Sequence, residues 1–317
     1  SGYYELGVTL IACAVLLYYR TLSSHWWIAG ATLAVVMATS TLTVINIGEY
    51  LSNTRVKLRN FYGVVRTRDY PSPVPFRVMY HGSINHGGQL LDPDMRNQPT
   101  SYFAPTSGYG RTFASLPSGS LRVGVIGLGA GAIAAYSKKG DVFRFYEIDP
   151  QVAAVALKEF TFLRDSPAQI DVILGDGRLS LEREPAQGYD LLAIDAFSGD
   201  SIPMHLVTRE AMAIYLRHLK PDGAIVFQAT NRFVDIAPVV ERLAAEFGMT
   251  AVMVSDEPET GTGADYWVSG TDQIIVSKNA ALLAADAIRS VAQPLVPRPD
   301  FRVWTDDFYN LLRILKL

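Results

Sequence analysis

The chain has 317 residues, of which 49% are hydrophobic, and its formal net charge at pH 7 is −3. This length suits about two domains. A charge near zero, with no basic run longer than two residues, argues against a nucleic-acid partner. The single cysteine, Cys13, excludes an internal disulfide framework and a thiolate metal site. We therefore expect a protein that acts on small molecules.

Two uncharged apolar segments lie near the N-terminus, at Leu6–Tyr19 and Trp26–Ile47. A helix of about 20 apolar residues spans the hydrocarbon core of a bilayer, so residues 1–52 are expected to form about two transmembrane helices. A pair of buried core helices is the alternative. Basic side chains between Arg55 and Arg68 follow the second segment, and this bias places the next domain on the cytoplasmic side of the lipid bilayer.

The remaining chain divides into two regions of different texture. Residues 53–112 contain short apolar stretches broken by turn residues, which indicates a small β-hairpin region. In residues 113–317, strand-like runs alternate with helix-like runs, which predicts a doubly wound, mostly parallel sheet in a Rossmann-like α/β fold. The expected strands cover 121–127, 141–148, 170–176, 189–197, 223–230, 250–256 and 273–279, and the expected helices cover 149–160, 207–219, 236–248 and the last segment, 304–317.

Glycines or acids follow four consecutive expected strands. In chain order these residues are Gly127, Gly129 and Gly131, then Glu147, then Asp176 with Gly177, and finally Asp195. A doubly wound sheet binds its ligand beyond the carboxyl ends of the strands. An ordered set of this kind is hard to explain by packing, so we expect these residues to line a nucleotide-like site.

The spacing of this set bears on the ligand. An acid about 20 residues after the glycines can accept hydrogen bonds from both ribose hydroxyls, which suits dinucleotides and S-adenosyl ligands alike. The glycines read G-x-G-x-G rather than G-x-G-x-x-G, and Asp176 within GDGR suits an adenine amino group. The ligand is therefore expected to be S-adenosylmethionine or a derivative.

In this order and spacing, the segments VGVIGLGAGA, YEIDP, GDGR and YDLLAIDAF resemble the spermidine synthase family of aminopropyltransferases. The bacterial branch with fused transmembrane helices is most similar, and the resemblance runs from about Asn60 to the C-terminus. It implies transfer of a group from an S-adenosylmethionine-type sulfonium, decarboxylated or not, to an amine or another nucleophile, with release of methylthioadenosine. It also implies polyamine biosynthesis, a multi-pass protein of the bacterial inner membrane, and a homodimer formed through the N-terminal β-region.

The resemblance implies contacts for the donor. Gln89 and Glu147 would bind the ribose, Asp176 would bind the adenine amine, and Gly127, Gly129 and Gly177 would let the backbone approach the ligand. Asn85 is a competing alignment for Gln89.

The resemblance also implies a catalytic pair. Asp195 would orient and deprotonate the attacking amine, and the Tyr102 hydroxyl would assist. A sulfonium is an activated leaving group, so catalysis consists mainly of holding a deprotonated nucleophile in line with the attacked carbon.

His81 and His86 lack metal-ligand spacing, and no metal is expected.

The chain departs from the family pattern at three positions. Ala130 stands where the family has an Asp that holds the amine of the decarboxylated donor, which makes unmodified S-adenosylmethionine a candidate. Ser198 replaces a second acid after the catalytic one, with Asp200 as a substitute. Trp267 stands where a Tyr is expected near the acceptor. Ser198, Asp200 and Trp267 are therefore the candidate acceptor contacts.

Two alternatives stay open at this point. A methyltransferase, or a lyase or cyclising enzyme, could use the same fold with unmodified S-adenosylmethionine. A non-catalytic sensor of an adenosyl metabolite or a polyamine could signal through the expected spans, although a sensor has no need of a general base.

Overall fold

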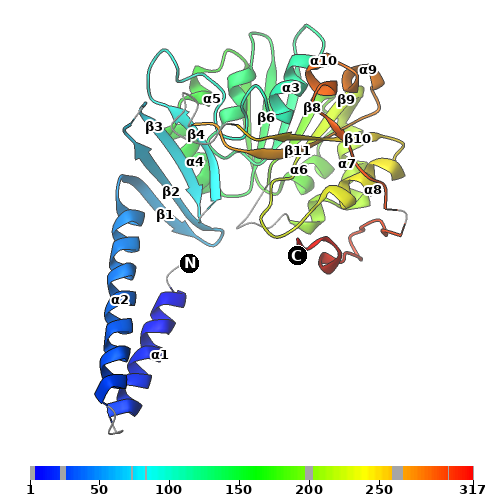
Figure 1. The fold of residues 1–317 in the computed structure, drawn as a ribbon. Coiled ribbons are helices and arrows are strands. Elements are labelled where there is room, and N and C mark those ends of the chain that lie inside the picture. Colours follow the sequence, from blue (N-terminus) through cyan, green and yellow to red (C-terminus); the bar gives the residue numbers. More distant parts are fainter. Residues whose placement is uncertain are drawn as a thin grey trace. The chain divides into compact units, whose positions relative to one another are not determined.

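The computed structural model describes residues 4–21, 26–72, 74–82, 84–196, 203–258, 267–298 and 300–316. The chain forms two compact units, residues 1–55 and residues 56–317 (Figure 1). The expected boundary between residues 112 and 113 stays a prediction.

The first unit consists mainly of two helices, α1 (Tyr4–Thr21) and α2 (Trp26–Leu51), which pack against each other. Both apolar segments are thus helical. Within the described residues, however, no helix combines the length and the apolarity that a membrane crossing needs, so the expected transmembrane helices are not supported. α1 has 18 residues and α2 has 26.

The turn-rich region forms a four-stranded sheet in the order β1-β2-β3-β4. The strands are β1 (Thr54–Asn60), β2 (Gly63–Tyr70), β3 (Phe76–His81) and β4 (Ile84–Leu90). β2, β3 and β4 pair antiparallel. The Asn60 carboxamide closes the first turn, because its Oδ1 accepts from the backbone amides of Tyr62 at 2.9 Å and Gly63 at 3.2 Å.

An eight-stranded sheet forms the centre of the second unit, in the order β12-β10-β11-β9-β8-β5-β6-β7. The strands are β5 (Arg122–Ile126), β6 (Val142–Glu147), β7 (Gln169–Leu174), β8 (Tyr189–Ile194), β9 (Leu219–Gln228), β10 (Thr250–Asp256), β11 (Thr271–Ser277) and β12 (Gln293–Pro294). The five strands β5 to β9 pair parallel, and β10, β11 and β12 form an antiparallel edge. All seven expected strands are confirmed.

Helices cover both faces of this sheet (Figure 1). They are α3 (Gly108–Ser115), α4 (Pro150–Glu159), α5 (Phe162–Asp165), α6 (Gly177–Arg183), α7 (Arg209–His218), α8 (Ala237–Glu246), α9 (Ala280–Leu283) and α10 (Asp286–Arg289), with 3₁₀ turns η1 (Ala132–Tyr136), η2 (Met204–Leu206) and η3 (Leu311–Ile314). The expected helices 149–160, 207–219 and 236–248 correspond to α4, α7 and α8. Side-chain caps start two of them: Asp149 for α4 and Thr208 for α7.

The expected helix at 304–317 was wrong in extent. Thr305 and Phe308 pair through their backbones in a turn, and only the short η3 follows. The Asn310 side chain caps η3 by accepting from the Leu312 amide at 3.1 Å, so the helical turn begins well after the expected start.

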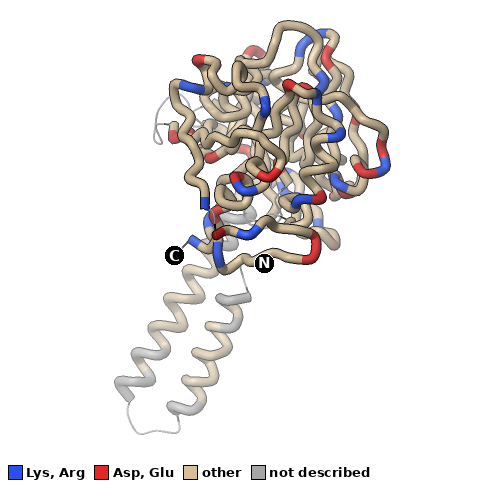
Figure 2. Tube along the Cα trace, turned by 90° about the vertical axis from the view of Figure 1, so that its right-hand side faces the viewer, with Lys and Arg blue, Asp and Glu red and all other residues tan. Residues whose placement is uncertain are grey.

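Each face of the main sheet has its own apolar core. Successive residues of a strand point to opposite faces, so Val125 of β5 packs with α3 and α4 while Ile126 packs with α6 and α7. Burial on both faces explains why these strands read as nearly continuous apolar runs. On the outside of the larger unit, Lys and Arg are intermixed with Asp and Glu (Figure 2).

The strand order places the functional edge. β5 lies between β6, which follows it in the chain, and β8, which comes later, so the winding direction of the sheet reverses between β5 and β8. Ligands of doubly wound sheets bind at such a switch point, beyond the carboxyl ends of the strands. Gly127 directly follows β5, and Asp195 directly follows β8.

Candidate active site

A cavity of about 170 Å³ lies at the carboxyl ends of β5, β6 and β8, and we call it the nucleoside cavity. Six of the expected site residues line it: Gly127, Gly129, Glu147, Asp176, Gly177 and Asp195. These residues come from four different strand-to-helix connections, so the parallel arrangement of the sheet brings them together.

The backbone of the chain itself requires two of the glycines. Gly127 and Gly129 have φ angles of +98° and +52°, in the left-handed region that favours glycine. A Cβ on Gly127 would lie 2.2 Å from the Asp195 carbonyl oxygen, and one on Gly129 would lie 2.5 Å from the His86 carbonyl oxygen. We expected glycines here because a ligand approaches the backbone closely. The structure adds a second reason, because the neighbouring loops also approach these glycines closely.

Glu147 ends β6 with its carboxylate held by two backbone amides. Oε2 accepts from Leu128 N at 3.0 Å, and Oε1 accepts from Asp149 N at 2.8 Å. Burial raises the pKa of Glu147, while these hydrogen bonds oppose the shift. The carboxylate is thus oriented before any ligand arrives, and it ties the glycine loop to the start of α4.

Asp176 caps α6 and forms a hydrogen bond with the side chain of His205. Its Oδ1 accepts from Leu179 N at 2.9 Å, and its Oδ2 lies 2.8 Å from His205 Nε2. The hydrogen bond with His205 is the main cause that lowers the pKa of Asp176, so the carboxylate stays ionised. His205 also lines the nucleoside cavity, which makes this pair one wall of it.

Asp195 and Tyr102 meet across the chain. The Tyr102 hydroxyl donates to Asp195 Oδ2 at 3.1 Å. Removal from water raises the pKa of Asp195 to about 8, the tyrosine hydrogen bond opposes this shift, and the negative Glu147 adds to it. Burial, with the nearby Asp195, raises the pKa of Tyr102, which therefore stays a hydrogen-bond donor. A carboxyl whose pKa lies near the working pH suits a general base.

A second cavity, of about 410 Å³, adjoins this pair, and we call it the acceptor-side cavity. Tyr102 lines it together with Gln228, Thr230, Asn231 and other residues. Among the described residues, Asp195 and His86 line both cavities. The carboxyl thus stands where a ligand in one cavity would meet a ligand in the other.

Gln89 lies outside both cavities. Its Nε2 donates to Thr161 Oγ1 at 2.8 Å and to the Arg96 carbonyl at 2.9 Å, and its Oε1 accepts from Thr161 N at 3.0 Å. The amide therefore links β4 to the connection between α4 and α5. Asn85, the competing alignment, lines the acceptor-side cavity and accepts from Gly87 N at 2.8 Å.

The expected acceptor contacts are only partly described. Ser198 and Asp200 lie outside the described residues. The Trp267 side chain packs against the small cluster formed by Phe76, Val78 and Leu90. Its carbonyl accepts from Ser101 N at 2.8 Å, so Trp267 supports the Tyr102 loop through its backbone.

Ala130 is 1% exposed and does not line either cavity among the described residues. Its amide donates to the His86 carbonyl at 2.8 Å. The glycine loop and the His86 loop are therefore fastened together at this point.

Sequence reasoning missed three residues of the site. Asp149 lines the nucleoside cavity, and its buried Oδ2 has no hydrogen-bond partner among the described residues. His86, examined only as a metal ligand, stands at the junction of the cavities. Gln273, fully buried in β11, donates to the Tyr102 carbonyl at 2.8 Å and accepts from Tyr109 N at 2.9 Å. A glutamine inside the apolar strand 271–277 was the one sequence signal for this positioning role.

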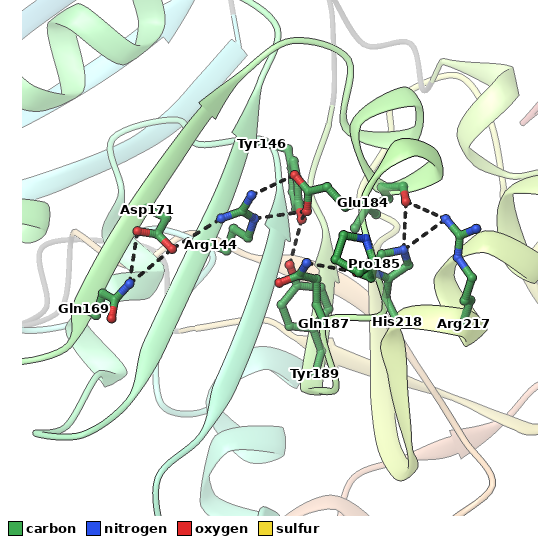
Figure 3. Close-up of polar contacts among 11 residues, drawn as sticks. Arg144, Tyr146, Gln169, Asp171, Glu184, Pro185, Gln187, Tyr189, Arg217 and His218 are labelled. Carbon is green, nitrogen blue, oxygen red and sulfur yellow. Dashed lines mark hydrogen bonds and ion pairs between the residues drawn. The ribbon is translucent and has the colours of Figure 1, made fainter.

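A polar network extends from Tyr146, and Figure 3 shows its side chains. Tyr146 lines the cavity, and its hydroxyl donates to Glu184 Oε2 at 2.9 Å and lies 2.8 Å from the Tyr189 hydroxyl. Arg144 donates to the same glutamate at 2.8 Å. Burial is the main cause that raises the pKa of Tyr146, so this tyrosine stays neutral.

No grouping of three or more His, Cys, Asp or Glu side chains among the described residues could hold a metal ion.

Comparisons with known proteins point to one family. A polyamine aminopropyltransferase from Vibrio vulnificus is 32% identical over 112 residues, which cover 33% of this chain and 36% of that protein. The probable spermidine synthase from Corynebacterium glutamicum has a similar structure, with a TM-score of 0.56 and 17% identity over 77% of this chain and 90% of that one. The first match is a likeness in sequence over 33% of this chain, and the second is a likeness in fold.

Two further spermidine synthase structures share this fold. The enzyme from Thermotoga maritima gives a TM-score of 0.50 at 16% identity, covering 78% of this chain and 81% of that one. A spermidine synthase in complex with the transition-state analogue AdoDATO gives 0.52 at 14% identity, covering 78% and 82%. No protein-family model matches the chain. The chain spans about a third of the length of the curated relative, and structural likeness at such low identity shows the fold alone.

Proposed function

We propose that the protein is an aminopropyltransferase. It would move the three-carbon amine chain of decarboxylated S-adenosylmethionine to an amine acceptor and release methylthioadenosine. The observation that carries the proposal is the place of Asp195, which accepts from Tyr102 at 3.1 Å where the two cavities meet.

The donor's adenosine would lie in the nucleoside cavity. Glu147, already oriented by two backbone amides, would accept from the ribose hydroxyls, and the free Oδ2 of Asp149 offers a further acceptor. Asp176 would accept from the adenine amine beside its contact with His205. Buried polar atoms are rarely left without partners, so the unpaired Asp149 oxygen is consistent with a polar ligand here.

The acceptor amine would reach Asp195 from the other cavity. The ionised carboxylate attracts the cationic amine and takes one proton, which leaves a nitrogen lone pair free to attack. As the new N–C bond forms at the methylene next to sulfur, the C–S bond breaks and its electron pair stays on sulfur as a neutral thioether. Tyr102 would hold the carboxylate in place through its donated hydrogen bond. The new secondary ammonium keeps the charge that the sulfonium loses.

The charges of the nucleoside cavity favour the decarboxylated donor. Its described lining includes four acids, Glu147, Asp149, Asp176 and Asp195, and no Lys or Arg. Unmodified S-adenosylmethionine carries a carboxylate, which would need a cationic partner when removed from water. The decarboxylated donor carries only positive charge and suits an acidic lining. Ala130 therefore does not by itself argue for the unmodified donor.

Product analysis tests the proposal. The purified protein is incubated with either donor, with and without putrescine, and the nucleoside products are identified by mass spectrometry. We expect methylthioadenosine only from the decarboxylated donor together with the amine. S-Adenosylhomocysteine would establish methyl transfer instead, and methylthioadenosine from unmodified S-adenosylmethionine would establish a lyase, a cyclising enzyme or transfer from the full donor. Tight binding without turnover would establish the sensor.

Location and assembly stay predictions from the sequence. Attachment to the bacterial inner membrane is tested by fractionating cells that express the full gene, and recovery in the wash without detergent would reject it. The homodimer is tested by light scattering of the purified protein, and a single-chain mass would reject it.

A further inference from the structure

We propose that His86 is the residue that binds the terminal ammonium of the donor's three-carbon chain, by accepting a hydrogen bond at Nε2. This assignment rests on the proposed function. It gives the donor's tail a partner that no motif in the sequence indicates.

The position of His86 carries the first part of the argument. Asp195 and His86 are the two described residues that line both cavities. A donor whose nucleoside occupies one cavity, and whose reacting carbon faces an amine in the other, must pass its chain through this junction. Asp195 is engaged there with Tyr102, which leaves His86 as the other described residue of the junction.

The free nitrogen of the ring carries the second part. His86 Nε2 is shielded from water and has no hydrogen-bond partner among the described residues. An unpaired buried nitrogen costs free energy unless a ligand satisfies it. Burial and the neighbouring His81, whose ring centroid lies 5.6 Å away, lower the pKa of His86 to about 4. The imidazole is therefore neutral at pH 7 and can accept a hydrogen bond from an ammonium.

The backbone of His86 holds the ring in register with the donor loop. Its carbonyl accepts from Ala130 N at 2.8 Å, and the close approach of Gly129 leaves no room for a Cβ between the two loops. The backbone of the loop that would follow the donor and the backbone that carries the ring are thus held together. A group fixed in this way loses little entropy when it binds.

Binding of two ligands that differ in the tail tests the inference. Methylthioadenosine has the nucleoside and sulfur of the donor but lacks the ammonium chain. By calorimetry, His86→Leu should weaken binding of decarboxylated S-adenosylmethionine by about 10–100-fold, as expected for loss of a hydrogen bond to a charged group, and leave methylthioadenosine within about twofold. His86→Gln, which keeps an acceptor near the place of Nε2, should recover most of the loss.

A matched control uses the histidine at the other end of the same cavity. His205 contacts Asp176 at 2.8 Å, on the side proposed for adenine, which both ligands share. His205→Leu should therefore weaken both ligands by the same factor. Circular dichroism and thermal melting of each variant identify any that fail to fold, and if His86→Leu does, His86→Ala takes its place in the same comparison.

The results separate this inference from the proposed function. If the wild-type protein turns over the decarboxylated donor but His86→Leu weakens both ligands equally, or neither, His86 does not bind the tail. A change confined to the KM of the amine acceptor would place His86 on the acceptor and would also overturn the inference. Absence of wild-type turnover instead rejects the proposed function.

Discussion

The hydroxyl of Tyr102 donates to Oδ2 of Asp195 at 3.1 Å, although 93 positions of the chain separate the two residues. The loop of Tyr102 is held by Gln273, and Asp195 extends from β8 directly beside Gly127. Two separately supported elements therefore meet at one carboxyl, and this contact gives the proposed reaction its base.

Replacing Asp195 with Asn should remove turnover while strengthening the fold. We expect kcat to fall by about 10²–10⁴-fold, because the amine loses its base. Methylthioadenosine binding should change little. The free energy of unfolding at pH 7 should rise by about 1–3 kcal/mol, because a carboxyl removed from water opposes folding when ionised. Steady-state kinetics and urea denaturation measure both effects.

Asp190→Asn is the matched control, because Asp190 lies in β8, the strand that leads to Asp195. Asp190 pairs with Lys220 at 2.7 Å and accepts from Arg122 N at 2.8 Å, away from both cavities. The Asp190→Asn substitution should lower the free energy of unfolding and leave kcat nearly unchanged. An Asp195→Asn variant that keeps more than a tenth of wild-type turnover would contradict the role of the base.

The pH dependence of activity should report the same carboxyl. The pKa of Asp195 is about 8 in the folded protein and 3.8 as an ordinary aspartate. Since the base must be ionised, kcat/KM should rise with pH, reach half of its maximum near pH 8 and level off above that pH. The rise of kcat with pH should occur at lower pH than the rise of kcat/KM, because the bound sulfonium and amine stabilise the carboxylate.

The contribution of Asp195 to the free energy of unfolding should decrease with pH, whereas kcat/KM increases. Between pH 4 and 8 the folded state holds a proton that the unfolded state has lost, so this group's contribution to stability falls as pH rises through that window. Chemical denaturation at several pH values, for wild type and Asp195→Asn, isolates the contribution. Equal pH slopes for the two proteins would show that Asp195 is not responsible.

Tyr102→Phe should lower kcat by about tenfold and move the acidic limb of kcat/KM to higher pH. The hydroxyl hydrogen bond holds the pKa of Asp195 down, so its loss raises that pKa further. Tyr80→Phe serves as a control, because Tyr80 pairs with the Tyr70 hydroxyl at 2.8 Å within the small sheet and lines neither cavity. If the acidic limb of kcat/KM moves in both Tyr102→Phe and Tyr80→Phe, or in neither, the result would argue against the contact between Tyr102 and Asp195.

Gly127→Ala should be more damaging than Gly119→Ala. Both glycines have positive φ angles, +98° and +138°, but only at Gly127 would a Cβ meet backbone, 2.2 Å from the Asp195 carbonyl oxygen, whereas Gly119 faces open space. We expect a loss of about 3 kcal/mol or more at Gly127 and about 1–2 kcal/mol at Gly119. Urea denaturation measures the two losses, and equal losses would contradict a tight junction between β5 and β8.

By itself the sequence determined the parallel part of the sheet and the acids at its strand ends. Local periodicity encodes which segments are buried strands, and glycines and acids directly after them must emerge at one edge once the strands are parallel. The same local reasoning failed for the last segment, where Thr305 and Phe308 pair instead of continuing a helix. It also treated apolar length near the N-terminus as sufficient for membrane spans, which the described helices do not support.

Only the tertiary structure decided how the site is assembled. Whether Gln89 faces the ligand or Thr161, and whether His86 reaches the junction of the cavities, depends on contacts between segments tens of residues apart. No local pattern records such contacts, because packing of the loops sets the direction of each side chain. The pKa of Asp195 has the same origin, because an aspartate at a strand end reaches a pKa of about 8 only when the surrounding fold removes it from water.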